Sequence, residues 1–306
     1  MKLLVGHTGF VGSNLKGQTH FDGLYNSANI EDAFGLNPDV LVYSGVRAEK
    51  FLANSEPEKD FEIIENAISN IQKINPKKLI LISTVDVYSK PVHVDESDDT
   101  QKLEQAYGKN RLFLENWVAE NFEDHLIVRL PALFGKNLKK NFIYDLIQIV
   151  PFMLNEKKFT ELSQENNWLN DYYTKQENTF YKLNTISAEA KKELKQKFLD
   201  MGFTALNFTD SRGVFQFYNL ADLWPDIETA QKHQIKKLNL ATEPVSVNEI
   251  YKAVFRKDFL NEILPEAPLY DFYTKHAPHF GGKSHYIRNK ETVLKAIQQF
   301  ISESVA

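Results

Sequence analysis

The sequence predicts an α/β protein built on a doubly wound parallel sheet. Short apolar runs alternate with amphipathic stretches through the first half of the 306 residues, and this alternation is typical of βαβ units whose sheet is covered on both faces. A glycine-rich turn directly follows the first apolar run. Crossovers between parallel strands are right-handed, so the ligand crevice of such a sheet is expected at the carboxyl ends of its strands.

Each predicted element follows from its own local pattern. The apolar runs expected to form strands are 2–5, 23–26, 39–44, 78–84 and 125–130. Amphipathic helices are expected over 61–74 and 107–122. In the second half a helix is expected over 187–202, with Ser187 as its N-cap and Gly202 at its end. A capping box formed by Ser246 and Glu249 predicts the start of another helix.

The composition excludes several classes of protein. The net charge is −5 and no long basic run occurs, so no nucleic-acid partner is expected. The chain has no cysteine, which rules out disulfides, thiolate metal sites and cysteine nucleophiles. The apolar run at the N-terminus is too short for a signal peptide, and no run of about 18 apolar residues is present. We therefore expect a cytoplasmic protein without a membrane partner.

The glycine-rich turn is the first candidate binding site. Gly6, Gly9 and Gly12 lie between the first predicted strand and the following helix. Backbone N–H groups of such a turn, together with the positive end of the helix, would face a phosphate. The spacing departs from the general G-x-G-x-x-G pattern because Thr8 occupies the place of the middle glycine. A glycine-rich turn without a ligand is the alternative interpretation.

Six segments, in order, resemble one known family. They are "GHTGFVGSNL" (6–15), "PDVLVYSGV" (38–46), "ISTVDVYSKP" (82–91), "AYGKNR" (106–111), "VRLPALFG" (128–135) and "LNLATEPVSVNEI" (238–250). Together they resemble the extended short-chain dehydrogenase/reductases, the NAD-dependent epimerase/dehydratase family that modifies nucleotide sugars. The resemblance extends over about residues 1–145 and 214–255, whereas 150–213 has no recognised counterpart.

The resemblance implies a fold and a function. It implies a Rossmann-type dinucleotide-binding domain over 1–145, to which 214–242 returns, and a smaller C-terminal α/β substrate lobe over 146–306 with an unusual insertion at 150–213. The implied function is an NAD(P)-dependent oxidoreductase, either an epimerase, a dehydratase or a reductase, that acts on a sugar or nucleotide-sugar carbinol by hydride transfer. A homodimer is a further expectation, since members of the family often pair through the helix that carries Tyr107. The alternative is a cofactor-binding sensor or structural protein without turnover.

The same resemblance assigns catalytic roles. It implies that Tyr107 is the general acid/base, that Thr84 is its hydrogen-bonding partner, and that the residue four positions after Tyr107 supplies a cation. The family has lysine there, whereas this chain has Arg111. An unperturbed phenol titrates near 10, so a fixed positive charge must favour its ionised form. Arginine supplies that charge with a planar fork in place of a compact ammonium. The competing interpretation is a Tyr–Arg contact on a helix surface.

The expected cofactor contacts gather at the ends of the predicted strands. The form of the cofactor, NAD or NADP, stays open, because the second strand is followed by neither a carboxylate nor an arginine. The expected contacts are Gly6, Thr8, Gly9, Phe10, Val11, Gly12, Asn26, Ser27, Asn29, Ile30, Ser44, Gly45, Val46, Arg47, Ser83, Tyr107, Arg111, Leu130 and Pro131.

The substrate side departs further from the family pattern. The expected substrate contacts are Asp86, Val87, Tyr88, Asn141 and Phe142. Val85 replaces an acid that dehydratases of the family carry, which argues against a 4,6-dehydration. Ala132 and Phe215 stand near positions where the family often has an asparagine and an arginine for a diphosphate. Arg212, Lys139 and Lys140 are the cations close in sequence.

Two further features have alternative explanations. The aromatic stretch 151–185 is either a lid that stacks on a ligand or ordinary packing of a small lobe. His276 and His279 are three residues apart, but Pro278 breaks helical geometry between them and no carboxylates accompany them, so no metal site is expected.

Overall fold

A six-stranded parallel sheet forms the centre of the computed structural model, which describes residues 1–98, 100, 103–177 and 179–305. Its order is β12-β5-β4-β3-β1-β2, and every neighbouring pair is parallel. The strands are β1 (Lys2–Val5), β2 (Gly23–Tyr25), β3 (Val40–Tyr43), β4 (Lys78–Thr84), β5 (His125–Leu130) and β12 (Lys237–Asn239). The predicted α/β fold is therefore confirmed, and all five expected strands agree with the prediction to within one residue at each end.

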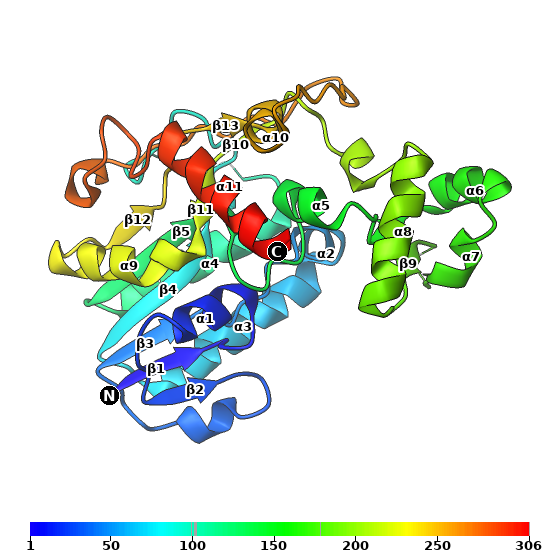
Figure 1. Ribbon diagram of the computed structural model, residues 1–306. Helices are drawn as coiled ribbons and strands as arrows, with labels where there is room; N and C mark the ends of the chain where they lie inside the picture. Colours follow the sequence, from blue (N-terminus) through cyan, green and yellow to red (C-terminus); the bar gives the residue numbers. More distant parts are fainter. Residues whose placement is uncertain (99, 101–102, 178, 306) are drawn as a thin grey trace.

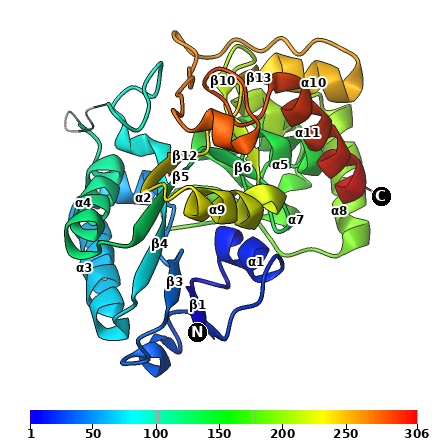
Figure 2. The same ribbon diagram turned by 90° about the vertical axis from the view of Figure 1, so that its left-hand side faces the viewer.

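Helices cover both faces of this sheet, as Figures 1 and 2 show. One face packs on α3 (Pro57–Ile74) and α4 (Ala106–Asn121), and the other on α1 (Phe10–Lys16) and α9 (Leu223–Lys232). Successive residues of a strand point to opposite faces. Thus Leu3 belongs to the core beneath α3 and α4, whereas its neighbour Leu4 belongs to the core beneath α9. This two-sided burial explains why the strands read as continuous apolar runs.

The helix ends follow their sequence signals. α3 begins earlier than predicted because Pro57 occupies the first helical position, where its missing N–H is not needed. Ser187 caps α8 (Ala188–Asp200), and Ser246 with Glu249 forms the expected capping box of α10 (Val247–Phe255). α2 (Lys50–Ser55) was not predicted. None of the described helices is long and apolar enough to cross a membrane.

The C-terminal elements form a second layer above the carboxyl edge of the sheet (Figure 1). Two small sheets pair β6 (Ala132–Phe134) with β11 (Phe217–Asn219) and β10 (Val214–Phe215) with β13 (Val245–Ser246). Helices α5 (Phe142–Gln148), α10 and α11 (Lys290–Val305) share one apolar core with β6 and β11. The short 3-10 helices are η1 (Ile30–Ala33), η2 (Val85–Val87), η3 (Ala205–Phe208), η4 (Leu220–Asp222) and η5 (Ala277–Phe280).

Residues 150–204, here termed the inserted segment, project from the body of the molecule (Figure 1). Besides α8, they form β7 (Met153–Leu154), α6 (Glu156–Glu165), α7 (Leu169–Tyr172), β8 (Tyr173–Lys175) and β9 (Tyr181–Leu183). Their aromatic side chains pack with aliphatic ones into a core of their own, as one of the two alternatives predicted. The segment joins the body at a narrow neck, where the Ala205 N–H donates to the carbonyl of Ile149 at 2.7 Å.

Candidate active site

The glycine turn lies where the sheet order reverses, between β1 and β3. Gly6 donates to the carbonyl of Tyr25 at 2.8 Å, and its φ of +88° suits glycine. A β-carbon on Gly6 would lie 2.5 Å from the carbonyl oxygen of Ser44, and one on Gly12 would lie 2.2 Å from that of Gly6. The fold itself therefore requires these two glycines.

Gly9 differs from its two neighbours in the turn. It is exposed, its φ is −74°, and an added β-carbon would meet only the carbonyl oxygen of Gly6 at 3.3 Å. Packing of the protein therefore constrains this position less than Gly6 and Gly12, and close approach of a ligand to the backbone would be a further reason for glycine. Thr8 is also exposed, while Phe10 and Val11 pack against the sheet core.

The turn after β2 is held by its own amide side chains. The Oδ1 of Asn29 accepts from the N–H of Asn26 at 2.8 Å, and its Nδ2 donates to the carbonyl of Leu24 at 3.1 Å. Ser27 is exposed beside them, and Ile30 packs on the core beneath α3. Asn29 therefore shapes the turn. Asn26 and Ser27, which directly follow β2, are neither a carboxylate nor an arginine, so the choice between NAD and NADP stays open.

The loop after β3 closes the other side of the turn. The Ser44 hydroxyl donates to the carbonyl of Val5 at 2.9 Å, which ties the ends of β3 and β1 together. Gly45 and Arg47 are exposed and Val46 is half-buried. The predicted cofactor contacts of the first three strands thus do gather at one edge of the sheet. At the end of β5, Pro131 is half-buried at this edge, whereas Leu130 lies in the core.

Thr84 and Tyr107 come together at the same edge. Thr84 ends β4 and Tyr107 lies in the first turn of α4, and the Thr84 side chain helps to lower the pKa of Tyr107. The helix lies directly against the chain after β4, since a β-carbon on Gly108 would be 2.2 Å from the carbonyl oxygen of Asp86. The N–H of Asp86 in turn donates to the Thr84 hydroxyl at 3.2 Å.

Arg111 lies beside Tyr107, as expected, but it also has an ion-pair partner that was not predicted. Its guanidinium donates to both carboxylate oxygens of Asp60 on α3, at 2.7 and 3.0 Å, and to the carbonyl of Arg47 at 2.7 Å. The side chains of Arg111 and Asp60 are only 5% and 6% exposed. The guanidinium carbon still lies 4.6 Å from the centre of the Tyr107 ring. Arg111 is thus shared between Asp60 and the phenol, and among the charges near Tyr107 it has the largest effect in favour of the phenolate.

The pKa of Tyr107 shifts accordingly. Burial raises this pKa above its ordinary value, and the charge of Asp86 adds to the rise. Arg111, the hydrogen bond from Thr84, and Lys50 act in the opposite direction without overcoming burial. Tyr107 is therefore a protonated phenol at neutral pH, which is the form of a proton donor.

A buried polar network lies behind this pair. Arg129 of β5 makes a bidentate contact with Glu115 of α4, and Ser83 donates to the same carboxylate at 2.5 Å. Arg129 also donates to the hydroxyl of Tyr88 at 2.7 Å, as does Asn239 at 2.9 Å. Burial raises the pKa of Tyr88 to about 12.

Burial corrects part of the substrate prediction. Val87, Tyr88 and Phe142 are all buried, the last in the core shared by α5, α10 and α11. We therefore revise these three from substrate contacts to core residues. Asn141 caps α5 and also donates to the carbonyl of Leu133 at 2.8 Å. Asp86 and Asn141 are the two of the five that stay partly exposed, and the Asp86 carboxylate lies at the sheet edge.

Sequence reasoning missed two residues that lie beside Asp86. The Nζ of Lys50, the first residue of α2, is 3.0 Å from Oδ1 of Asp86, and the hydroxyl of Tyr270 donates to the same oxygen at 3.2 Å. Lys50 follows the loop after β3, a position that could have pointed to the site. Tyr270 is 184 residues from Asp86 and carries no such signal.

The cations considered for a diphosphate are differently placed. Arg212 makes two hydrogen bonds to Asp210, at 3.0 and 2.7 Å, and a third to the carbonyl of Leu264. Lys140 donates to the carbonyl of Ala48 at 2.8 Å, and Lys139 is exposed. Only the two lysines therefore remain as cations for a diphosphate.

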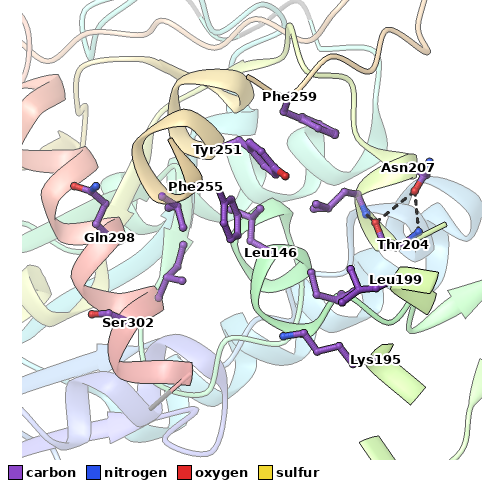
Figure 3. Close-up of a pocket in the computed structure, with 14 residues that line it drawn as sticks. Leu146, Lys195, Leu199, Thr204, Asn207, Tyr251, Phe255, Phe259, Gln298 and Ser302 are labelled. Atoms are coloured by element: carbon purple, nitrogen blue, oxygen red, sulfur yellow. Dashed lines mark hydrogen bonds between the residues drawn. The ribbon is translucent and has the colours of Figure 1, made fainter. Parts of the chain in front are cut away.

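A cavity of about 680 Å³ lies elsewhere, between α5, α8, α10 and α11 (Figure 3). Its lining, which includes Leu146, Leu199, Phe255 and Ile301, is mainly apolar, and it contains no residue of the predicted site.

His279 stacks on His233 with ring centres 4.1 Å apart. No cluster of three or more potential metal ligands occurs among the residues that the structure describes.

Comparison with known proteins agrees with this geometry. The sequence profile of the family described as RmlD substrate binding domain matches residues 1–151. The fold is similar to that of RMD from Pseudomonas aeruginosa complexed with NADPH, at 13% identity over 99% of this chain and 98% of that one, with a TM-score of 0.61. It is also similar to dTDP-4-dehydrorhamnose reductase from Bacillus anthracis in complex with NADP, at 16% identity, 99% and 97% coverage and a TM-score of 0.62.

A UDP-galactose 4-epimerase shares the fold too, at 15% identity with 99% of each chain covered and a TM-score of 0.59. The search of curated proteins gave no match. Fold and profile together define a Rossmann-type α/β protein. Within that class, the profile match over residues 1–151 and the similar folds agree with the resemblance of its motifs to the extended short-chain dehydrogenases/reductases, the epimerase/dehydratase family.

Proposed function

We propose that the protein is an NAD(P)-dependent oxidoreductase that reduces a carbonyl group of a sugar or nucleotide sugar. The observation that carries the proposal is the placement of Thr84, at the end of β4, and Tyr107, in the first turn of α4, at the carboxyl edge of the sheet. This edge also carries the glycine turn, whose exposed Gly9 leaves the backbone open to a pyrophosphate. The residues present therefore fit a dinucleotide.

In the proposed reaction the hydroxyls of Tyr107 and Thr84 donate hydrogen bonds to the carbonyl oxygen of the substrate. The bound nicotinamide would supply the hydride. As negative charge develops on the oxygen, Tyr107 delivers its proton, and the Thr84 hydroxyl then stabilises the phenolate. A raised pKa suits this direction, because the phenol is already protonated when the carbonyl arrives. Proton abstraction from a carbinol, as an epimerase requires, needs the scarcer phenolate.

The similar structures support this choice of substrate and cofactor. Two of them are named for NADPH or NADP, and one of these is a dTDP-4-dehydrorhamnose reductase. A dehydratase needs an acid and a base in separate roles. Here Asp86 stands at the position of the base, but a buried valine, Val85, replaces the acid. A reductase needs only the one proton donor.

Binding and turnover test the proposal separately. Fluorescence titration with NADH and NADPH measures dinucleotide affinity, and lack of affinity for both would overturn the proposal. UDP-, GDP- and dTDP-sugars should then raise the melting temperature in the presence of NADPH, because ligands that bind only the native state stabilise it. Consumption of NADPH with dTDP-4-dehydrorhamnose as the first probe measures reduction directly.

A second candidate is a cofactor-binding sensor without turnover. The pairing of Arg111 with Asp60 favours it, since a cation committed to a structural ion pair contributes less to proton transfer. Tight dinucleotide binding together with no NADPH consumption across the sugar panel would support this candidate over the reductase.

A further inference from the structure

The cavity of about 680 Å³ lies where the inserted segment meets the body of the molecule (Figure 3). Leu199 of α8 lines it from the inserted segment. Leu146 of α5, Phe255 at the end of α10 and Ile301 of α11 line it from the body. A volume of this size is typical of sites that enclose small molecules. The cavity is separate from the site of Thr84 and Tyr107, so it needs an explanation of its own.

Apolar side chains form most of the lining, and some of them are not covered by protein. Leu146 and Leu206 are buried, whereas Leu199 and Phe255 remain 47% and 41% exposed. Removing such apolar surface from water is favourable. The cavity is therefore suited to a ligand whose body is apolar.

Most polar side chains of the lining already have partners in the protein. The Gln298 amide donates to a backbone carbonyl at 2.6 Å, and the Ser302 hydroxyl donates to another at 2.8 Å. Thr204 and Asn207 are hydrogen-bonded to each other, as the dashed lines in Figure 3 show. The Tyr251 hydroxyl has no hydrogen-bond partner among the described residues, but it is neutral, and a neutral hydroxyl is less costly than a charge where water is scarce.

Lys195 of α8 is different. Among the described residues of the lining it alone carries a charge, and none is acidic. Its side chain is half-buried, and its Nζ reaches toward α5, where it lies 3.4 Å from the carbonyl oxygen of Ile147. That distance is long for a hydrogen bond from an ammonium group. Within the described part of the chain no carboxylate pairs with Lys195, whereas Lys197 of the same helix pairs with Glu193 at 2.8 Å.

We propose that this cavity binds a small molecule with an apolar body and one carboxylate group. The carboxylate pairs with Lys195, and the apolar body lies against Leu146, Leu199 and Phe255. Charge complementarity selects the carboxylate, because the lining offers one positive charge and no negative charge among its described residues. Since the lining comes from both the inserted segment and the body, such a ligand also bridges the two beside the neck.

The test is isothermal titration calorimetry of the intact chain with octanoate, 1-octanol and acetate. Octanoate carries both the apolar body and the carboxylate, and it should bind at a single site. Octanol should bind more weakly because it lacks the charge, and acetate should show no measurable binding because it lacks the body. Decanoate should bind more tightly than octanoate, by roughly fourfold for each additional methylene group that is buried.

Substitutions in the lining separate the two parts of the ligand. Lys195→Met should weaken octanoate binding roughly tenfold and leave octanol binding nearly unchanged, because it removes only the partner of the carboxylate. Phe255→Ser should weaken the binding of both ligands, because it removes apolar surface that both cover. Lys192→Met, at an exposed lysine of the same helix, is the matched control. Urea unfolding should show that all three variants remain folded.

Several outcomes would overturn the proposal. Absence of saturable octanoate and decanoate binding at millimolar concentrations is one, and octanol binding as tight as that of octanoate is another. Octanoate affinity that survives both Lys195→Met and Phe255→Ser, or that falls equally in Lys192→Met, would place the ligand outside this cavity. These measurements need neither cofactor nor turnover, so their result is independent of the proposed reductase activity.

Discussion

Arg111 and Asp60 form a buried, bidentate ion pair between α4 and α3, with N–O distances of 2.7 and 3.0 Å. The pair also holds the loop after β3, through the bond from Arg111 to the carbonyl of Arg47. Arg111, which occupies the position of the family lysine, thus joins α4, α3 and the loop after β3. Its loss should affect stability first.

Arg111→Met should lower the free energy of unfolding by about 3–5 kcal/mol, because it leaves the Asp60 carboxylate buried without a partner. Urea unfolding measures this loss. Arg111→Lys keeps the charge but not the two-pronged geometry, so its stability should fall between that of the wild type and Arg111→Met. The double variant Asp60→Leu/Arg111→Met should recover much of the lost stability. If it does not, the Asp60–Arg111 ion pair is not the cause of the loss.

Tyr107→Phe should reduce turnover by roughly 10²–10⁴-fold, because it removes the proton donor. Dinucleotide affinity should change little, and urea unfolding should show that the variant remains folded. NADPH consumption and fluorescence titration, measured on the same samples, check the two halves of this prediction. Unaltered turnover in Tyr107→Phe would remove the tyrosine from the chemistry.

Gly9→Val and Gly12→Val should fail in different ways. A β-carbon at Gly9 meets only one backbone oxygen, at 3.3 Å, so the variant should fold while its side chain blocks the dinucleotide. A β-carbon at Gly12 would lie 2.2 Å from the carbonyl oxygen of Gly6, so that variant should be strongly destabilised. Thermal unfolding and NADPH titration of both proteins distinguish the effects. A folded Gly9→Val protein with full NADPH affinity would remove the turn from the site.

Asp145 of α5 should make stability depend on pH. Burial raises the pKa of this carboxyl group to about 7. Because the folded-state pKa exceeds the unfolded one, the contribution to stability is complete below about pH 4 and is lost as the pH rises through about 7. Asp145→Asn should therefore be more stable than the wild type at alkaline pH, with a gap that closes on acidification. Urea unfolding across the pH range checks this, with the exposed Asp171→Asn as control.

The sheet was predictable because its strands are buried on both faces and read as uninterrupted apolar runs. The choice of Thr84 and Tyr107 as site residues came from the family resemblance of their segments, and the structure places both at the carboxyl edge of the sheet. The side chains that contact these site residues could not be predicted from the sequence. Asp60 is 51 residues from Arg111, and its position on the buried face of α3 appears only when the two helices pack. Tyr88 was expected to contact the substrate, but its hydroxyl is buried and accepts hydrogen bonds from Arg129 and Asn239, which lie on two other strands.

The neck between Ile149 and Ala205 has a consequence for how the chain can be rearranged. The chain leaves the body at Ile149 and returns to it at Ala205, and the N–H of Ala205 is 2.7 Å from the carbonyl oxygen of Ile149. The inserted segment between them has a core of its own that is rich in aromatic side chains. A turn of a few residues can span that gap, so the projecting part behaves as a detachable module. Deleting the inserted segment should leave the central sheet folded and the positions of Thr84 and Tyr107 unchanged. The same junction should also tolerate the insertion of another domain.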